Sequence, residues 1–125
     1  MTGTFYAEAG SNGPLLCGKQ TTFEGGVRVP TIAWGPSYVQ AGSISHQSGS
    51  LMDLFTTSLH LAGVEQPTDR VIDGINLVDV LKKNSEVDRA IFHYRGNTLF
   101  AVRWGPHKAH LWTWTNSWEE YQTVS

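Results

Sequence analysis

The sequence predicts a mixed α/β fold, and three stretches with different hydrophobic patterns carry that prediction. Residues 27–34 form a largely apolar run, which is typical of a buried strand. Residues 51–62 repeat apolar side chains at helical spacing, and after Arg89 the apolar residues alternate with a period of two. The order of strand, helices and then a meander of strands favours an α/β or α+β unit.

The first strand is interrupted by Pro30, which lacks the N–H that a central strand would donate. We therefore expect an edge strand, or regular pairing only beyond Pro30. Residues 1–20 are rich in glycine and polar residues, and a strong turn signal lies at 11–14. Because this stretch has no element of its own, we expect a truncated N-terminus.

The helix predicted over residues 51–62 is the clearest element of the chain. Ser50 and Asp53 have the spacing of a capping box, and Gly63 is a natural stop. One broad apolar stripe runs along this helix. The stripe consists of Leu51, Leu54, Phe55, Leu59, Leu61 and Ala62.

A second, shorter helix is expected from about residue 77 to 83. Asn76 is its cap, and two lysines, Lys82 and Lys83, suit the C-terminal end of its dipole. The connector at 105–108 is short, so the last two of the strands that follow should form an antiparallel hairpin. The strands are predicted over residues 91–94, 99–104 and 109–115.

Composition limits the function. The 125 residues are 40% hydrophobic and 16% charged, enough to bury a core. The net charge of −2 and the scattered lysines and arginines give no footprint for nucleic acid or an anionic membrane. No apolar run is long enough to span a bilayer, and residues 1–10 lack the pattern of a signal peptide.

The single cysteine, Cys17, is a buried hydrophobe, a reactive thiol or half of a disulfide with a partner outside the chain.

Lys19 is the first candidate functional residue. It lies in a polar, glycine-flanked loop just before the apolar run at 27–34. A lysine ammonium suits a tetrahedral anion, and neighbouring loop N–H groups can add donors. The alternative is that Lys19 is an ordinary exposed lysine without a functional role. Composition alone favours this alternative over an anion-binding role.

The late histidines and tryptophans raise two further possibilities, a zinc site and a sugar-binding face. His107 and His110 are three residues apart, so on a strand they face opposite sides and do not form a zinc site. A row of exposed tryptophans on one strand face would suit sugar rings, as in a carbohydrate-binding module; burial against other parts of the protein is the alternative that we favour. The row consists of Lys108, His110, Trp112 and Trp114, with Trp118 nearby.

One long run carries a resemblance to a known family. Residues 16–30, L-C-G-K-Q-T-T-F-E-G-G-V-R-V-P, resemble the sulfatase motif in which a lysine precedes a Thr-aromatic-Glu-Gly-Gly-x-Arg-x-Pro segment. The sulfatases belong to the alkaline-phosphatase-like superfamily. Further runs resemble later parts of the family in the same order, which makes the likeness specific. They are residues 50–57 with 61–63, 73–77 and 108–110.

The resemblance implies a site with one catalytic residue in this chain. Lys19 matches the family lysine that contacts the substrate sulfate, and His110 is placed at the substrate rim. Cys17 lacks the Cys-x-Pro-Ser-Arg context of the formylglycine nucleophile, and the cysteine that pairs with this position in similar sulfatases is expected beyond Ser125. The resemblance also places the calcium ligands and the general acid upstream, so we expect no metal ligands here. Arg28 is expected to pair with Glu24 or with upstream carboxylates.

The resemblance further implies an organisation and a role. Residues 1–88 would be the C-terminal end of the catalytic domain, with the end of the large sheet and its covering helix. Residues 89–125 would begin a small antiparallel C-terminal subdomain. The parent would be a lysosomal hydrolase that removes sulfate from galactose or N-acetylgalactosamine units of glycosaminoglycans. It would form a homodimer. The chain alone is expected to be inactive; a carbohydrate-binding module is the alternative, and a short gene product with a regulatory binding role is a third reading.

Overall fold

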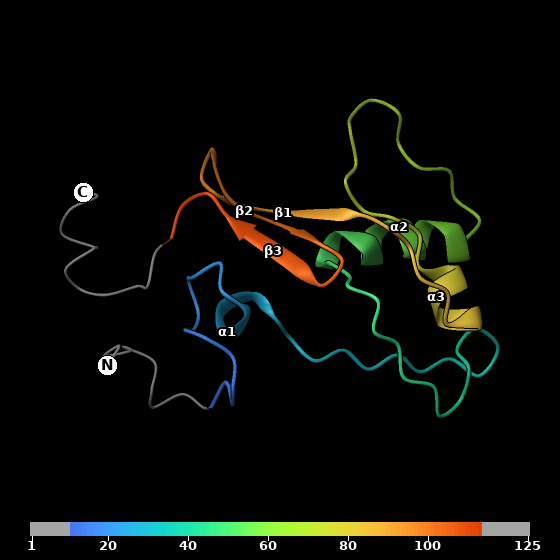
Figure 1. Cartoon of the computed structure of the whole chain (residues 1–125). Coiled ribbons are helices and arrows are strands. Elements are labelled where there is room, and N and C mark those ends of the chain that lie inside the picture. The colour runs from blue at the N-terminus through green and yellow to red at the C-terminus, as the bar shows by residue number, and fades with distance from the viewer. Residues whose placement is uncertain (1–10, 114–125) are drawn as a thin grey trace. The chain divides into compact units, whose positions relative to one another are not determined.

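The computed structural model describes residues 11–113 and divides into two compact units (Figure 1). The sheet unit comprises Met1–Thr31 and Ala90–Ser125, and the helix unit comprises Ile32–Arg89. The sheet unit contains α1 (Glu24–Val27), β1 (Ala90–Arg95), β2 (Thr98–Trp104) and β3 (His107–His110). The helix unit contains α2 (Leu51–Leu61) and α3 (Val78–Lys83).

The three strands form one antiparallel sheet in the order β1-β2-β3. Gly96 and Gly105 both have positive φ angles, 55° and 53°, in the tight turns that join the strands. This backbone conformation suits glycine because a side chain would be strained there. The predicted hairpin between the last two strands is confirmed, although its turn is shorter than expected and β3 already begins at His107.

The third strand also ends earlier than predicted. The sequence favoured residues 109–115, but the strand stops at His110, and the N–H groups of Leu111 and Trp112 both donate to the Phe100 carbonyl. Two donors on one acceptor break the regular ladder, so the alternation does not continue. The last two residues of the predicted strand, 114 and 115, lie outside the described part of the chain.

The strand predicted over residues 27–34 is wrong. Its first residue closes the single turn of α1, and residues 28–34 have no strand structure. Ile32 is 95% exposed and Trp34 is 87% exposed, so the run is not buried either. A strand needs a neighbour for its N–H and C=O groups, and within residues 11–113 none pairs with this segment; Pro30 removes a donor as well.

Both predicted helices are confirmed. α2 begins after Ser50, whose N–H donates to Asp53 Oδ2 at 2.6 Å in the predicted capping box. α3 begins after Leu77, and the Val78 N–H donates to Asn76 Oδ1 at 2.9 Å, so Asn76 satisfies a donor of the first turn. Asn84 ends α3 in the left-handed conformation.

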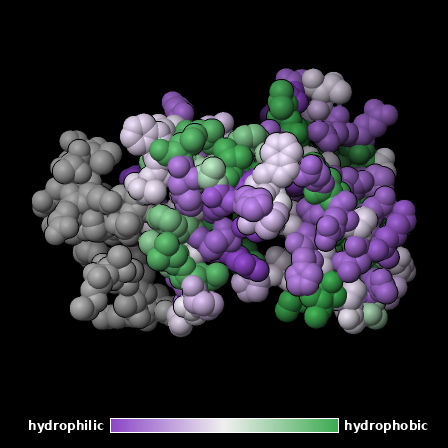
Figure 2. Space-filling view, in the orientation of Figure 1, coloured by the Kyte–Doolittle hydropathy of each residue, from purple (hydrophilic) through white to green (hydrophobic). Residues whose placement is uncertain are grey.

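The buried side of α2 is polar, which the sequence did not predict. Asp53 is fully buried and Thr57 is buried, whereas Leu51 of the apolar stripe is 79% exposed. Figure 2 shows hydrophobic side chains, in green, interspersed among hydrophilic ones at the surface. The other large exposed residues on α2 are Met52, Leu54, Phe55 and Leu61.

Asp53 ties α2 to the segment that precedes α3. Its Oδ1 accepts hydrogen bonds from the Ile75 N–H at 2.9 Å and from Arg89 Nη1 at 2.5 Å. Gly74 lies so close to the helix that a Cβ there would overlap the Met52 carbonyl oxygen. The segment therefore packs backbone against backbone, and only glycine fits at this position.

The described residues thus form short helices and a small three-stranded antiparallel sheet, as in a mixed α/β fold. The small antiparallel sheet lies in the part of the sequence where it was expected. The division of the chain into a catalytic-domain part, residues 1–88, and a C-terminal subdomain part, residues 89–125, stays a prediction.

Candidate functional site

Lys19 lies exposed in a tight turn of the sheet unit. The Thr21 N–H and the Thr21 hydroxyl both donate to the Gly18 carbonyl, at 3.2 and 2.8 Å, which closes the turn around Lys19. Gln20 has a φ angle of 76°. Lys19 is thus an exposed residue in a turn whose backbone is held by hydrogen bonds.

Two glycines allow this turn to fold against α1. The Gly25 N–H donates to the Leu16 carbonyl at 2.9 Å, and a Cβ on Gly25 would overlap the Cys17 carbonyl oxygen. A Cβ on Gly26 would overlap the Thr21 carbonyl oxygen. Residues 16–27, which we call the lysine loop, consequently form one compact body whose packing requires both glycines.

Glu24 joins the lysine loop to the sheet. Its Oε1 accepts a hydrogen bond from Lys108 Nζ of β3 at 3.0 Å and lies 3.1 Å from Arg103 Nη1 of β2. Burial alone would raise the pKa of the Glu24 carboxyl, but the Lys108 hydrogen bond and the charges of Lys108, Arg103 and Arg28 outweigh it and lower the pKa. The Glu24 carboxylate thus pairs with Lys108 and Arg103, and Arg28 contributes through its charge.

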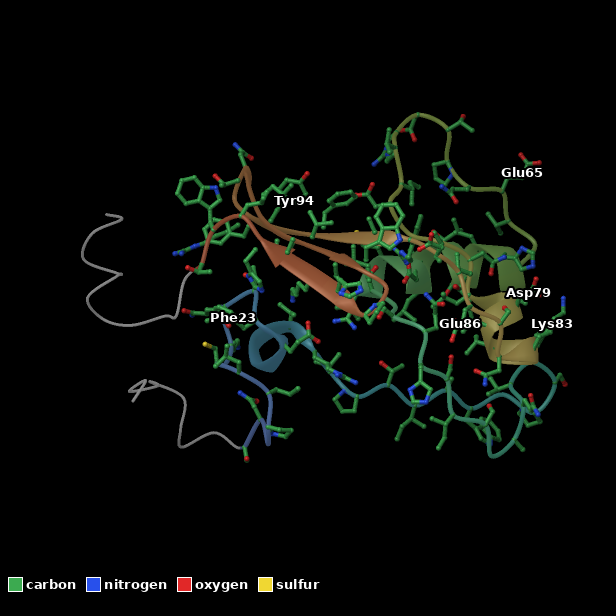
Figure 3. The ribbon with its side chains drawn as sticks, viewed as in Figure 1. Phe23, Glu65, Asp79, Lys83, Glu86 and Tyr94 are labelled. Carbon is green, nitrogen blue, oxygen red and sulfur yellow. The ribbon has the colours of Figure 1, made fainter. Side chains whose placement is uncertain are left out.

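His110 also contacts the lysine loop. Its ring stacks on Phe23, with centroids 4.5 Å apart and planes 25° apart, and its Nδ1 lies 3.3 Å from Thr22 Oγ1. Figure 3 labels Phe23 beside α1. Burial and the charge of Lys108 lower the pKa of His110, and Glu24 opposes them. The structure thus brings His110 to the loop that carries Lys19, the two residues that the sequence predicted for substrate binding.

A second histidine lies in the same row of the sheet. His93 pairs with Ala101, which pairs with His110, so the three side chains share one face. The His93 Nε2 is buried without a hydrogen-bond partner among the described residues, and burial and the charge of Lys108 lower the pKa of this ring. Protonation of His93 or His110 would add positive charge beside Lys108, and the lowered pKa values disfavour it.

No residue set in the described part of the chain fits a metal or the formylglycine. Within residues 11–113 no three histidine, cysteine or carboxylate side chains gather as metal ligands, and Asp53 is occupied by Arg89 and backbone donors. Cys17 is half-buried and is followed by Gly18 and Lys19, so it does not have the nucleophile's context. These described residues therefore do not fit calcium, which needs several converging oxygen ligands.

The tryptophan row is only partly formed. Lys108 and His110 do share a face, but that face is covered by the lysine loop through Glu24 and Phe23. Trp112 lies beyond the end of β3 and is 61% exposed, so the burial that we favoured for these tryptophans is wrong for this residue within the described part of the chain. The strand that would carry the row ends at His110, and Trp114 and Trp118 lie outside the described residues.

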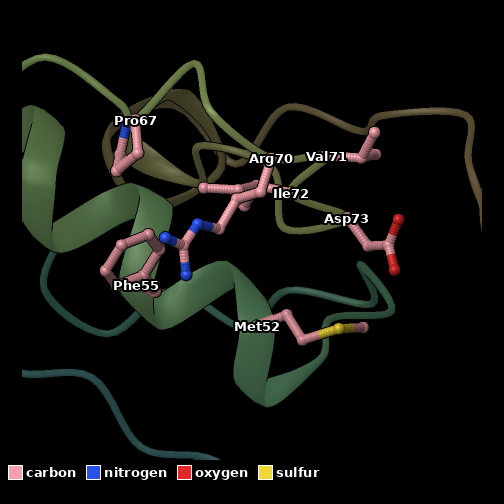
Figure 4. A pocket seen from close by; sticks show the side chains of 7 residues that line it. All are labelled: Met52, Phe55, Pro67, Arg70, Val71, Ile72 and Asp73. Carbon is pink, nitrogen blue, oxygen red and sulfur yellow. The ribbon is translucent and has the colours of Figure 1, made fainter.

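The helix unit has an open hollow of its own (Figure 4). Met52 and Phe55 of α2 form one wall, and Arg70 extends toward Phe55 from the opposite segment. Arg70 is held by Asp69 in an exposed ion pair, with Nη2 and Oδ2 2.5 Å apart. The side chains that line the hollow form no cluster of reactive groups. The other lining residues are Pro67, Val71, Ile72 and Asp73.

Sequence reasoning missed the partners that hold this site. Glu24 and Lys108 are 84 residues apart, and nothing local in the sequence signals that they meet. One signal was available: Lys108 and His110 alternate on one strand face, so a single segment packed on that face contacts both. The Asp53 and Arg89 pair was missed for the same reason, because its residues are 36 apart.

Comparisons with known proteins agree with the motifs. A family profile described as "Sulfatase" matches residues 5–64, and one described as "C-terminal region of aryl-sulfatase" matches residues 86–125. Two N-acetylgalactosamine-6-sulfatases are similar: the mouse protein is 67% identical over 114 residues, and the human protein is 63% identical over 115. These alignments cover 91% and 92% of this chain and 22% of each relative.

A human steryl-sulfatase is also similar, at 40% identity over 114 residues, which is 90% of this chain and 19% of that protein. The chain therefore spans about a fifth of the length of these curated relatives. Within residues 11–113, no helix is long and apolar enough to cross a membrane. Two family profiles and relatives at up to 67% identity agree with the lysine motif, and the chain belongs to the sulfatase family.

Proposed function

We propose that this chain forms part of a sulfatase and contributes Lys19, whose ammonium contacts the sulfate group of the substrate. The observation that carries the proposal is the identity of 67% over 114 residues to a named N-acetylgalactosamine-6-sulfatase, with Lys19 in the family's lysine motif. The exposure of Lys19 in this hydrogen-bonded turn also supports it, because an exposed side chain is accessible to a substrate.

The chemistry of Lys19 is electrostatic. When a sulfate ester is cleaved, negative charge develops on the oxygens, and a fixed cation lowers the energy of that state. The tight turn at Gly18 and Thr21 limits how far the lysine backbone moves, so little reorganisation is needed during the reaction. His110 belongs to the same proposed site, as a substrate-contacting residue at the edge of the lysine loop.

The proposed substrate is a sulfate ester on galactose or N-acetylgalactosamine in a glycosaminoglycan. The name of the mouse and human relatives supports N-acetylgalactosamine 6-sulfate. In the proposed whole enzyme, other segments supply the ligands of the calcium ion and the formylglycine. The whole enzyme would have an alkaline-phosphatase-like fold. We place that enzyme in the acidic lysosome, as a homodimer.

Two proteins test this function: the 125-residue chain, and a hybrid enzyme in which this chain replaces the matching 114-residue stretch of the mouse sulfatase. We expect the hybrid to hydrolyse N-acetylgalactosamine 6-sulfate and the chain alone to show no turnover of an aryl sulfate. An inactive but folded hybrid contradicts the sulfatase role. Measurable turnover by the chain alone contradicts the expectation that the nucleophile is supplied by another part of the enzyme.

The carbohydrate-binding module predicts a different result for the chain alone. It requires a folded chain whose tryptophan fluorescence is quenched saturably by a sulfated glycan. The sulfatase proposal instead expects poor folding or aggregation, because Ile32, Trp34 and Leu51 expose large apolar surfaces. The covered face around Lys108 and His110 also favours the sulfatase proposal over the module.

A further inference from the structure

The lysine loop is rigid within itself, so whatever holds one end of it also positions Lys19. Hydrogen bonds join Gly25 to Leu16 and Thr21 to Gly18, and they bracket Lys19 on both sides. The Gly25 backbone also packs against the Cys17 carbonyl so closely that a Cβ on Gly25 would overlap it. A displacement of α1 therefore moves the turn that presents Lys19.

One of the contacts that hold α1 is ionic and comes from the sheet. A single oxygen, Glu24 Oε1, faces Lys108 of β3 and Arg103 of β2, two side chains that are paired across neighbouring strands. The Lys108 side chain is only 9% exposed and that of Glu24 is 28% exposed, so water screens this contact less than a surface ion pair. Hydrogen bonds to such charged groups are stronger and more directional than neutral ones.

We propose that Glu24 is a positioning residue: through Lys108 and Arg103 it holds the lysine loop on the three-stranded sheet and so fixes Lys19 where it meets the sulfate. This inference rests on the proposed function of Lys19. It assigns a task to the sheet of residues 90–110, which lies in the C-terminal region of the family: the sheet is the platform of an active-site loop.

The neighbouring histidines are consistent with this assignment. The groups that face Glu24 and its partners across this interface are Arg103, Lys108, His93 and His110 from the sheet and Arg28, the residue that follows the lysine loop. Two sheet cations, Arg103 and Lys108, face one carboxylate. The stack of His110 on Phe23 holds the same loop one residue away from Glu24.

The first test reads loop mobility and needs no catalysis. In the hybrid enzyme, Glu24→Gln keeps the shape of the side chain and removes its charge. We expect faster amide hydrogen exchange in residues 16–27, unchanged exchange in α2, and recovery in Glu24→Asp. Glu86→Gln, an exposed glutamate of the helix unit labelled in Figure 3, is the matched control and should change neither region.

Unchanged exchange in residues 16–27 overturns the proposal. Loss of protection in both the lysine loop and α2 also overturns it, because Glu24 would then maintain the whole fold rather than one loop.

The second test is a double-mutant cycle on kcat/KM. Glu24→Gln should lower kcat/KM of the hybrid about 10-fold, the size of one lost charged hydrogen bond. In a Lys19→Ala background the same change should cost less than about 2-fold, because Glu24 acts through Lys19. A loss of about 10-fold in both backgrounds means that Glu24 acts independently of Lys19 and contradicts the proposal. If Lys19→Ala alone has no effect, the proposed function fails, whereas the exchange result still decides whether Glu24 holds the loop.

Discussion

Each unit of this chain fixes a loop with a carboxylate, but the two carboxylates lie in different surroundings. In the helix unit Asp53 is fully buried, and its partners are Arg89 and the N–H groups of Ser50 and Ile75. In the sheet unit Glu24 is partly exposed and has two long, flexible cationic partners. We assign the first arrangement to stabilising the fold, and we propose that the second positions a substrate-contacting loop.

The burial of each carboxylate determines how much its removal should cost in folding free energy. Removing Asp53 leaves the Arg89 guanidinium buried without its counter-charge, which is costly. The Lys108 side chain is as little exposed as that of Arg89, but Glu24 is itself 28% exposed and its second partner, Arg103, is 23% exposed, so removing Glu24 should cost less folding free energy. The consequence of losing Glu24 should therefore appear mainly in the position of Lys19.

The largest expected effect on stability comes from Asp53. Asp53→Ala should lower the free energy of unfolding of the hybrid by about 3–5 kcal/mol, because a buried ion pair is broken from one side. Thermal or urea unfolding measures this change. A loss below about 1 kcal/mol, the size expected for an exposed pair, would mean that the two carboxylates are equivalent, and the comparison would fail.

Two glycines at close backbone approaches give the next comparison. Gly74→Ala places a Cβ against the Met52 carbonyl and should cost about 1–3 kcal/mol of stability. Gly25→Ala places a Cβ against the Cys17 carbonyl and should displace the lysine loop. We expect Gly25→Ala to lower kcat/KM by a larger factor than Gly74→Ala in hybrids compared at a temperature where both are folded. Equal losses of activity would contradict the separation of roles.

Acidification should have the smallest effect, confined to the sheet unit. The pKa of His110 in the folded chain lies below its usual value of 6.5, so below pH 6.5 the unfolded chain binds more protons and stability falls. The stability that Glu24 contributes is present above pH 4.5 and is lost as the pH falls through its lowered pKa. Between about pH 7.5 and about pH 5.5, protection of β3 amides should therefore decrease.

The matched variant is His110→Gln, in which this decrease should become smaller once exchange is corrected for its intrinsic pH dependence. His60→Gln, on the exposed side of α2, serves as the control. An unchanged pH response in His110→Gln would mean that His110 does not titrate in this range.

Local features of this molecule could be predicted from its sequence, whereas features that need distant partners could not. The cap at Ser50 and the hairpin at Gly105 depend on neighbouring residues, and both are confirmed. The predicted cap of the second helix was one residue off: the N-cap of α3 is Leu77, although the Asn76 side chain still accepts the Val78 N–H. The strand at 27–34 failed because a strand depends on a neighbour elsewhere in the chain. The polar face of α2 was missed because the burial of Asp53 depends on Arg89, 36 residues away.

The candidate site shows the same limit. Lys19 and His110 were predicted from a resemblance, and the contact between His110 and the lysine loop came only from the structure. Glu24 was part of the quoted motif, but its partners on β2 and β3 were not expected. The motif indicated which residues matter, and the folded sheet indicated how one of them is held.

The most direct measurement is the activity of the hybrid enzyme with Lys19→Ala. Loss of one preorganised charge-stabilising group should lower kcat by about 10²–10³-fold with little change in thermal stability. Lys83→Ala, at an exposed lysine that pairs with Asp79 on α3 (Figure 3), should leave kcat unchanged. An equal kcat for Lys19→Ala and the unmodified hybrid would show that Lys19 does not contact the sulfate and would contradict the account.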